Sequence, residues 1–171
     1  GLLSTTTRLD IGENVYNRDW DVLVILDACR VDALKAVADE YEFIGEVESM
    51  WSIASTSPEW HALTFRKRYR DQIAETAYIT ANVQFEKVMF DRVAPPTINK
   101  PPFSPSFDSY GVVNPEDFRR IDPVYRYAHD SDLGVVPPRK ITDRAIDVAR
   151  SDRPNKEVVH YLQPHTPYIG V

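Results

Sequence analysis

The strongest hydrophobic pattern in the chain is a run of five apolar residues, Val22–Leu26, which ends in the carboxylate of Asp27. A run that is apolar at every position is typical of a strand buried on both faces, as in a parallel sheet. Residues 156–162 form a second, nearly continuous apolar segment close to the other end of the chain. We therefore expect both segments to be interior strands of one sheet.

Helical and strand-like segments alternate between these two runs. In residues 31–41, Ala33, Leu34, Val37 and Ala38 recur at the spacing of a helix that packs on a sheet. The other predicted helices cover residues 57–70, 84–92, 116–129 and 141–150, and the other predicted strands cover residues 42–48 and 76–82. This alternation predicts an α/β fold, with a mostly parallel sheet flanked by helices on both faces.

Prolines crowd residues 93–138 and predict a long irregular excursion from the alternating pattern. The helix predicted at residues 116–129 is the one regular element expected within it. An irregular stretch of this length inside a domain is typical of a functional loop or a lid.

The composition is that of one globular domain with a sizeable core, since the chain has 171 residues of which 43% are hydrophobic. A net charge of -6 argues against a general nucleic-acid binder. The single cysteine, Cys29, excludes an internal disulfide framework and a multi-cysteine zinc site. No apolar run approaches the roughly 20 residues of a membrane span, and no signal peptide is visible. We therefore expect a cytoplasmic protein.

Two segments of the sequence contain candidate functional residues. Asp27 lies at the carboxyl end of a predicted strand, where open α/β sheets bind their ligands; it is either a metal ligand or a cap of the following helix. Ser57 and Pro58 have the pattern of an N-cap followed by a proline in the first turn. Thr56 then lies just before a helix N-terminus, whose N–H groups suit a phosphate or sulfate. The competing interpretation is that Thr56 and Ser57 only cap that helix.

Three ordered segments resemble motifs of the alkaline phosphatase and sulfatase superfamily. Residues 24–34, Val-Ile-Leu-Asp-Ala-Cys-Arg-Val-Asp-Ala-Leu, resemble its opening motif. Residues 160–168, His-Tyr-Leu-Gln-Pro-His-Thr-Pro-Tyr, resemble its later strand, which ends in a Pro-His-x-Pro-aromatic element. Residues 56–60, Thr-Ser-Pro-Glu-Trp, lie where sulfatases have their Cys-x-Pro-Ser-Arg nucleophile motif. Overall the chain is most similar to the sulfatase-like hydrolases of salt-loving archaea.

This resemblance implies a role for each matching residue. Asp27 would bind a divalent metal ion, with zinc, manganese, calcium and magnesium as the alternatives. Thr56 would be the nucleophile, with Ser55 and Ser57 as the alternatives beside it. His165 would contact the transferred group or the leaving oxygen.

The resemblance also implies a single sulfatase-like catalytic domain over residues 1–171, of the alkaline phosphatase type and truncated at its C-terminal end. The second metal motif of the superfamily, an Asp-His pair followed by glycine, would fall beyond Val171. Two more residues are candidates for binding the substrate. Arg30 could reach an anion, or could pair with Asp32 or Asp27, and Asn82 could line the same crevice at the end of its strand.

Several departures from the sulfatase pattern bear on the reaction. Threonine cannot be converted to formylglycine, Trp60 replaces the motif arginine, and Ala28 stands where many sulfatases have a second acid. These changes favour a phosphatase, phosphodiesterase or phospho-group transferase, acting on a small-molecule, glycan or lipid phosphate or sulfate ester. The alternative is a catalytically degenerate relative that binds a ligand or partner. A nucleotide-binding Rossmann-like module is disfavoured, because no glycine-rich loop follows the first strand.

The remaining histidines have weaker signals. His160, inside the last predicted strand, is expected to be a packed core residue more than a ligand. His61, on the helix after Thr56, faces either the core or the site, and His129 is expected at the surface.

Overall fold

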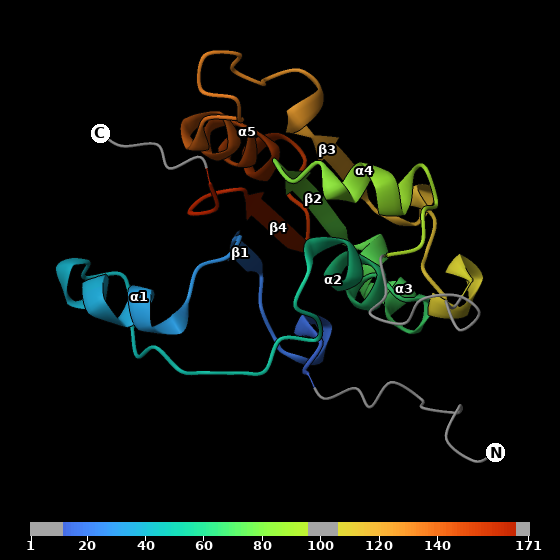
Figure 1. The fold of residues 1–171 in the computed structure, drawn as a ribbon, viewed down its shortest axis with the longest axis horizontal. Helices are drawn as coiled ribbons and strands as arrows, with labels where there is room; N and C mark the ends of the chain where they lie inside the picture. The colour runs from blue at the N-terminus through green and yellow to red at the C-terminus, as the bar shows by residue number, and fades with distance from the viewer. Residues whose placement is uncertain (1–11, 96–105, 167–171) are drawn as a thin grey trace.

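A computed structural model describes residues 12–95 and 106–166 of the chain. Its centre is a four-stranded sheet of β1 (Val22–Leu26), β2 (Thr76–Thr80), β3 (Arg120–Pro123) and β4 (Lys156–Tyr161). The strands lie in the order β1-β4-β2-β3, and every pair of neighbours is parallel (Figure 1). The predicted α/β fold with a parallel sheet is confirmed.

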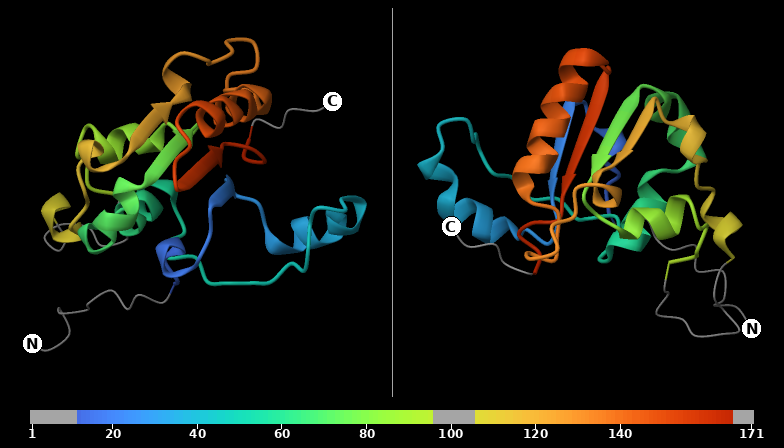
Figure 2. Two further views of the ribbon diagram at one scale, coloured as in Figure 1. Left: turned by 180° about the vertical axis from the view of Figure 1, so that it is seen from behind. Right: turned by 90° about the horizontal axis from the view of Figure 1, so that it is seen from above.

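Helices cover both faces of this sheet, as the alternating pattern predicts. The five α-helices of the described residues are α1 (Val31–Val37), α2 (Ser57–Thr64), α3 (Arg70–Ala74), α4 (Gln84–Met89) and α5 (Pro138–Ser151). Helix α5 packs on one face, and α2, α3 and α4 pack on the other, with a separate hydrophobic cluster on each side. Figure 2 shows the two layers edge-on in its right-hand view. No helix among the described residues is long and apolar enough to cross a membrane.

The two predicted helices at residues 84–92 and 141–150 are confirmed as α4 and α5. Helix α5 buries Ile141, Ala145 and Val148, which recur at intervals of four and three residues along one side. Its first turn contains Pro138, where the missing N–H breaks no helical hydrogen bond.

The prediction that both apolar strands are interior is right for β4 and wrong for β1. Strand β4 lies between β1 and β2, and its Val158 and Val159 are buried. Strand β1 is at the edge, and Val22, Val24 and Leu26 on its α5 side are 57%, 55% and 41% exposed. Only the alternate residues of β1 pack against the core on the other face. Among the described residues no fifth strand and no helix covers this edge, although the apolar sequence suits burial on both faces.

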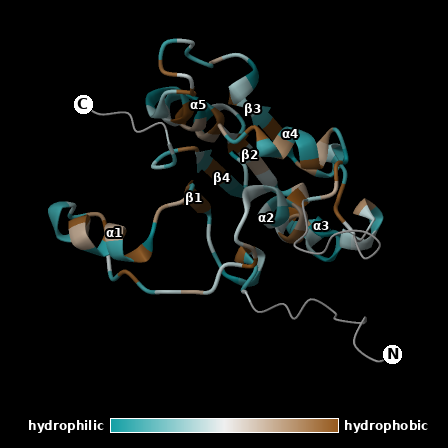
Figure 3. Cartoon of the chain, in the orientation of Figure 1, coloured by the Kyte–Doolittle hydropathy of each residue, from teal (hydrophilic) through white to brown (hydrophobic). Residues whose placement is uncertain are grey.

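Helix α1 forms near its predicted position but does not pack on the sheet. It buries none of its residues, and it projects from the body of the molecule in both views of Figure 2. Figure 3 shows hydrophobic positions on α1, which lies apart from the helices that pack on the sheet. The apolar spacing of residues 31–41 therefore predicted the helix and not its packing.

Three other sequence predictions need correction. Residues 42–48 form a turn and irregular chain in place of a strand. The helix predicted at residues 57–70 is divided, because Phe65 leaves helical geometry at ψ 56° and Arg66 is extended at ψ 151°. Residues 116–129 contain the short strand β3 between two 3-10 turns, in place of the predicted α-helix. Pro123 fits there because β3 is the outer strand, where a missing N–H is tolerated.

The exposure of β1 leads to a prediction about stability. Val24 and Val159 are register partners on the same face of neighbouring strands, but Val159 is only 4% exposed. We expect Val159→Ala to lower the free energy of unfolding by roughly 2 kcal/mol or more, since it removes buried methyl groups and leaves a cavity. Val24→Ala should cost less than about 1 kcal/mol. Denaturant titration of both variants measures the difference, and equal costs would show that the α5 side of β1 is covered.

Candidate active site at the carboxyl edge of the sheet

The candidate site lies at the edge of the sheet where β1, β4 and β2 end. Asp27 directly follows β1, and its N–H donates to the carbonyl of Tyr161 at the end of β4 (3.4 Å). Asn82 follows β2, two residues after Thr80. Because these strands are parallel, their carboxyl ends meet, which is where ligands bind in open α/β sheets.

The backbone turns sharply as soon as it has placed Asp27. Ala28 has a φ of 63°, in the left-handed region that residues with a side chain rarely adopt. Backbone strain of this kind clusters at functional sites. The turn carries the chain out of the sheet toward α1 and leaves Asp27 at the end of β1.

Two side chains from other elements donate hydrogen bonds to the Asp27 carboxylate. Asn82 donates from Nδ2 to Oδ2 at 2.7 Å, and Ser57, the first residue of α2, donates from Oγ to the same oxygen at 3.2 Å. The other carboxylate oxygen, Oδ1, accepts no hydrogen bond from a described residue. Three segments far apart in the sequence therefore converge on one half-buried carboxylate.

Asn82 was expected to line the crevice, and the structure places it against Asp27. The residue is 1% exposed, and its Oδ1 accepts the N–H of Gln84 at the start of α4 (2.9 Å). Its own N–H donates to the hydroxyl of Thr80 (3.0 Å). Asn82 is thus fixed by both its backbone and its side chain.

The start of α2 differs from the predicted arrangement. The N-cap is Thr56 and not Ser57, and its side chain makes no capping hydrogen bond. Ser57 is the first helical residue and turns its hydroxyl to Asp27. Pro58 is in the first turn, as predicted. The Thr56 side chain is exposed at this helix N-terminus, next to the residue that holds Asp27.

The structure does not bring Arg30 or His165 to Asp27. Arg30 is exposed and donates to both oxygens of Asp32 at 2.8 Å, so the ion-pair alternative for this residue is the observed one. His165 is also exposed, and its Nδ1 lies 2.9 Å from the carbonyl oxygen of Thr166. Neither residue has a recorded contact with the carboxylate.

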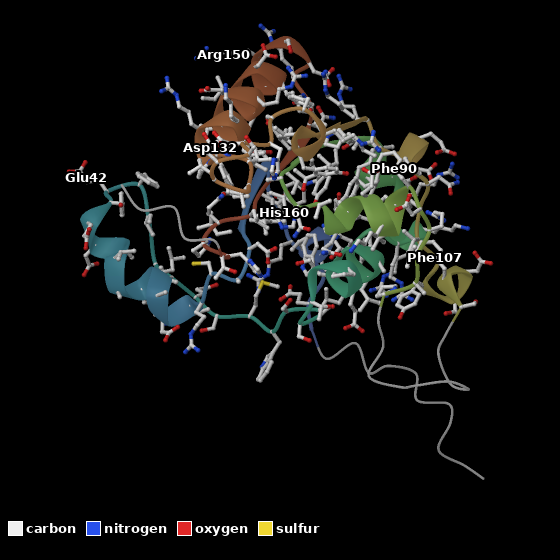
Figure 4. All side chains as sticks on the ribbon, turned by 45° about the horizontal axis from the view of Figure 1, so that its top comes forward. Glu42, Phe90, Phe107, Asp132, Arg150 and His160 are labelled. Atoms are coloured by element: carbon white, nitrogen blue, oxygen red, sulfur yellow. The ribbon has the colours of Figure 1, made fainter. Side chains whose placement is uncertain are left out.

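Beneath the site lies a buried network that the sequence did not reveal as a unit. The hydroxyl of Tyr78 on β2 lies 2.6 Å from Nδ1 of His160 on β4 and 3.0 Å from Nε2 of His61 on α2. Since a tyrosine hydroxyl has one proton, it donates to one histidine and accepts from the other. Figure 4 shows His160 among closely packed side chains. His160 is a core residue as expected, and His61 faces the core.

Strand register places this network on the site's side of the sheet. His160 is paired with Ile25 and Thr80, and side chains two residues apart on a strand share a face. Asp27 and Asn82, two residues beyond these partners, therefore lie on the same face as His160. The ring of Trp60 covers His160 edge-on, with centroids 5.7 Å apart. The candidate site therefore lies against the rings of Trp60, His160 and Tyr78.

Burial keeps both histidines of the network uncharged. It lowers the pKa of His61 well below the ordinary value, with a smaller effect of the neighbouring His160, and it lowers the pKa of His160 to about 3. Nδ1 of His61 is buried without a hydrogen-bond partner among the described residues. A neutral imidazole tolerates this position better than a charged one.

Asp27 fits a divalent metal ion as one ligand. Its Oδ1, which accepts no hydrogen bond from a described residue, and the hydroxyl of Ser57 are oxygen ligands of the kind that suits hard ions such as magnesium, calcium or manganese. The part of the chain that the structure describes contains no group of three or more His, Cys, Asp or Glu side chains that could hold an ion. A closed metal site would need further ligands from outside the described residues.

Comparison with known proteins adds no assignment: no protein-family model, no curated protein and no solved structure matches the chain.

The neutral histidines lead to a prediction about pH. In the unfolded chain each histidine takes up a proton near pH 6.5, whereas the buried ring does not. Unfolding therefore takes up protons below about pH 6.5. As the pH is lowered through this range, the free energy of unfolding falls by on the order of 1 kcal/mol per pH unit for each histidine. Denaturant titrations between about pH 7 and pH 5 measure this slope, above the range where most carboxyl groups titrate.

His129 provides the control because it is exposed. We expect His129→Gln to leave the slope unchanged and His160→Gln to reduce it by roughly half, because one of the two buried histidines is removed. A slope that His160→Gln does not change would contradict the assignment of a neutral buried ring.

Proposed function

We propose that this chain belongs to a metal-dependent hydrolase or transferase that acts on phosphate or sulfate esters through a hydroxyl nucleophile. The observation that supports it best is the convergence of Asn82 and Ser57 on the Asp27 carboxylate, at the edge of the sheet where ligands bind. The motifs that resemble the alkaline phosphatase and sulfatase superfamily contain Asp27 and Ser57, whereas Asn82 lies outside all three of them.

In this proposal Thr56 is the attacking residue. Its side chain is exposed and makes no capping hydrogen bond, whereas the hydroxyl of Ser57 donates to Asp27. The first N–H groups of α2, which have no partner within the helix, bind the anionic oxygens of the ester. The Thr56 hydroxyl gives up its proton as its oxygen forms a bond to phosphorus or sulfur, and the ester oxygen leaves with the electrons of the broken bond and takes up one proton. Water or an acceptor alcohol then takes the group from Thr56.

Asp27 is the metal ligand of this mechanism. A bound divalent ion lowers the pKa of a neighbouring hydroxyl and neutralises negative charge as the reaction proceeds. The contribution of the chain is to hold the carboxylate in one orientation at the end of β1. A threonine nucleophile favours phosphate over sulfate, because the formylglycine of true sulfatases cannot form from it.

The second candidate is a relative that binds an ester or a partner without turnover. The observation that favours it is the position of Arg30, which pairs with Asp32 and so leaves Asp27 without a recorded contact to a cation among the described residues. A binding protein would tolerate this, whereas catalysis requires charge stabilisation from elsewhere.

Substitution of the three consecutive hydroxyls tests the assignment of the nucleophile. In the intact protein we expect Thr56→Ala to reduce the turnover of an aryl phosphate by several orders of magnitude, because it removes the attacking atom. Thr56→Ser should retain measurable turnover. Ser55→Ala, one residue further from α2, should be nearly neutral and is the matched control. Near-normal turnover of Thr56→Ala, with loss of turnover in a folded Ser57→Ala, would assign the nucleophile to Ser57 instead.

Asp27 is tested by a nearly isosteric change. We expect Asp27→Asn to abolish turnover and to weaken Mn²⁺ binding, because an amide oxygen is a poorer ligand than a carboxylate for a hard cation. A chelator should inactivate the wild-type protein, and added Mn²⁺ should restore it. Asp32→Asn is the matched control, since Asp32 is exposed and paired with Arg30. Full turnover by Asp27→Asn would exclude the proposed metal ligand.

A further inference from the structure

Both hydrogen bonds to Asp27 end on the same oxygen. Asn82 and Ser57 donate to Oδ2, at 2.7 Å and 3.2 Å, and Oδ1 receives no bond from the described residues. A carboxylate held in this way cannot rotate freely about its last bond without losing both contacts. Oδ2 is thus hydrogen-bonded twice, and Oδ1 has no hydrogen-bond partner among the described residues.

The orientation of the Asn82 amide follows from its other contact. Its Oδ1 accepts the backbone N–H of Gln84 at 2.9 Å, so this atom must be the carbonyl oxygen and the NH₂ group must point to Asp27. The reversed amide would place a donor against the N–H of Gln84 and an acceptor against a carboxylate. Because Asn82 is 1% exposed, bulk water does not compete for these bonds.

We propose that Asn82 is a positioning residue for Asp27 and not a substrate-binding residue, an inference that rests on the proposed function. By donating to Oδ2, it directs Oδ1 outward as a single oxygen ligand for the metal ion. Its buried amide already uses the oxygen and one N–H, which leaves little capacity to bind a substrate. Residues that orient a metal ligand in this way typically contribute about 10- to 100-fold to metal affinity.

Asparagine suits this position for an electrostatic reason. An aspartate here would present a second negative charge to Asp27 and could not donate when ionised. A leucine of similar size would leave Oδ2 without its stronger partner. The neutral amide supplies a donor to Asp27 and an acceptor to the start of α4 at the same time.

Asn82→Ser separates the two contacts of this side chain. Serine can still accept the N–H of Gln84, since it is a good capping residue, but its side chain is too short to reach Asp27. Asn114→Ser is the matched control, because it makes the same change at an exposed capping asparagine. We expect Asn82→Ser, in the intact protein, to weaken Mn²⁺ binding measured by calorimetry by about 10- to 100-fold, and Asn114→Ser to change it little.

Kinetics with an aryl phosphate at saturating Mn²⁺ separate positioning from substrate binding. We expect Asn82→Ser to lower kcat with little change in KM, whereas loss of a substrate contact would raise KM. In an Asp27→Asn background, Asn82→Ser should have no further effect on Mn²⁺ affinity. This second comparison uses the folded Asp27→Asn and double variants, and a further loss of affinity in the double variant would show that Asn82 does not act through Asp27.

The outcomes also distinguish this inference from the proposed function. If Asp27→Asn weakens Mn²⁺ binding and Asn82→Ser leaves it unchanged, the positioning role is wrong and the metal ligand stands. If Asp27→Asn leaves Mn²⁺ affinity unchanged, the proposed function itself fails. An increased KM with unaltered metal affinity in Asn82→Ser would make Asn82 a substrate-binding residue.

Discussion

The parallel pairing of β4 with β1 on one side and β2 on the other determines where the candidate site lies. Parallel strands bring their carboxyl ends to one edge, and here that edge receives Asp27 from β1 and Asn82 from the turn after β2. The third group, Ser57, is added because α2 begins beside the same edge. Residues separated by 55 positions in the sequence therefore share one hydrogen bond.

Buried polar contacts beneath this edge fix the position of α2 relative to the sheet. His61 of α2 contacts Tyr78 of β2, which in turn contacts His160 of β4, and all three side chains are buried. An unpaired polar group in such a position is costly, so this network favours one relative placement of helix and strands. The first residue of α2 is thereby held against Asp27, which couples the core to the candidate site.

Much of this arrangement could be predicted from the sequence, because it depends on local patterns. The apolar runs predicted β1 and β4, and the alternation of elements predicted the parallel sheet with helices on both faces. The convergence of Asp27 and Asn82 follows from the rule that parallel strands end together. Pro58 correctly indicated the first turn of α2.

The remaining features depend on tertiary contacts that no local pattern encodes. Val22–Leu26 is apolar enough for an interior strand, but strand order is set by long-range pairing and places it at the edge. Ser57 has the pattern of a cap, yet the helix already begins at Ser57, so Thr56 occupies the N-cap position and the Ser57 hydroxyl donates to the Asp27 carboxylate. The link from His61 through Tyr78 to His160 joins three separate elements and was visible only as isolated polar residues.

The central claim is that a hydroxyl at the N-terminus of α2 becomes covalently modified during turnover. Its most direct test is mass spectrometry of the intact protein, quenched in acid during reaction with an aryl phosphate and then mapped by peptides. The account predicts one added phosphoryl group, located on Thr56 and absent from Thr56→Ala. Turnover without any phosphorylated residue in the segment around Thr56, or a phosphoryl group on a residue remote from Asp27, would contradict it.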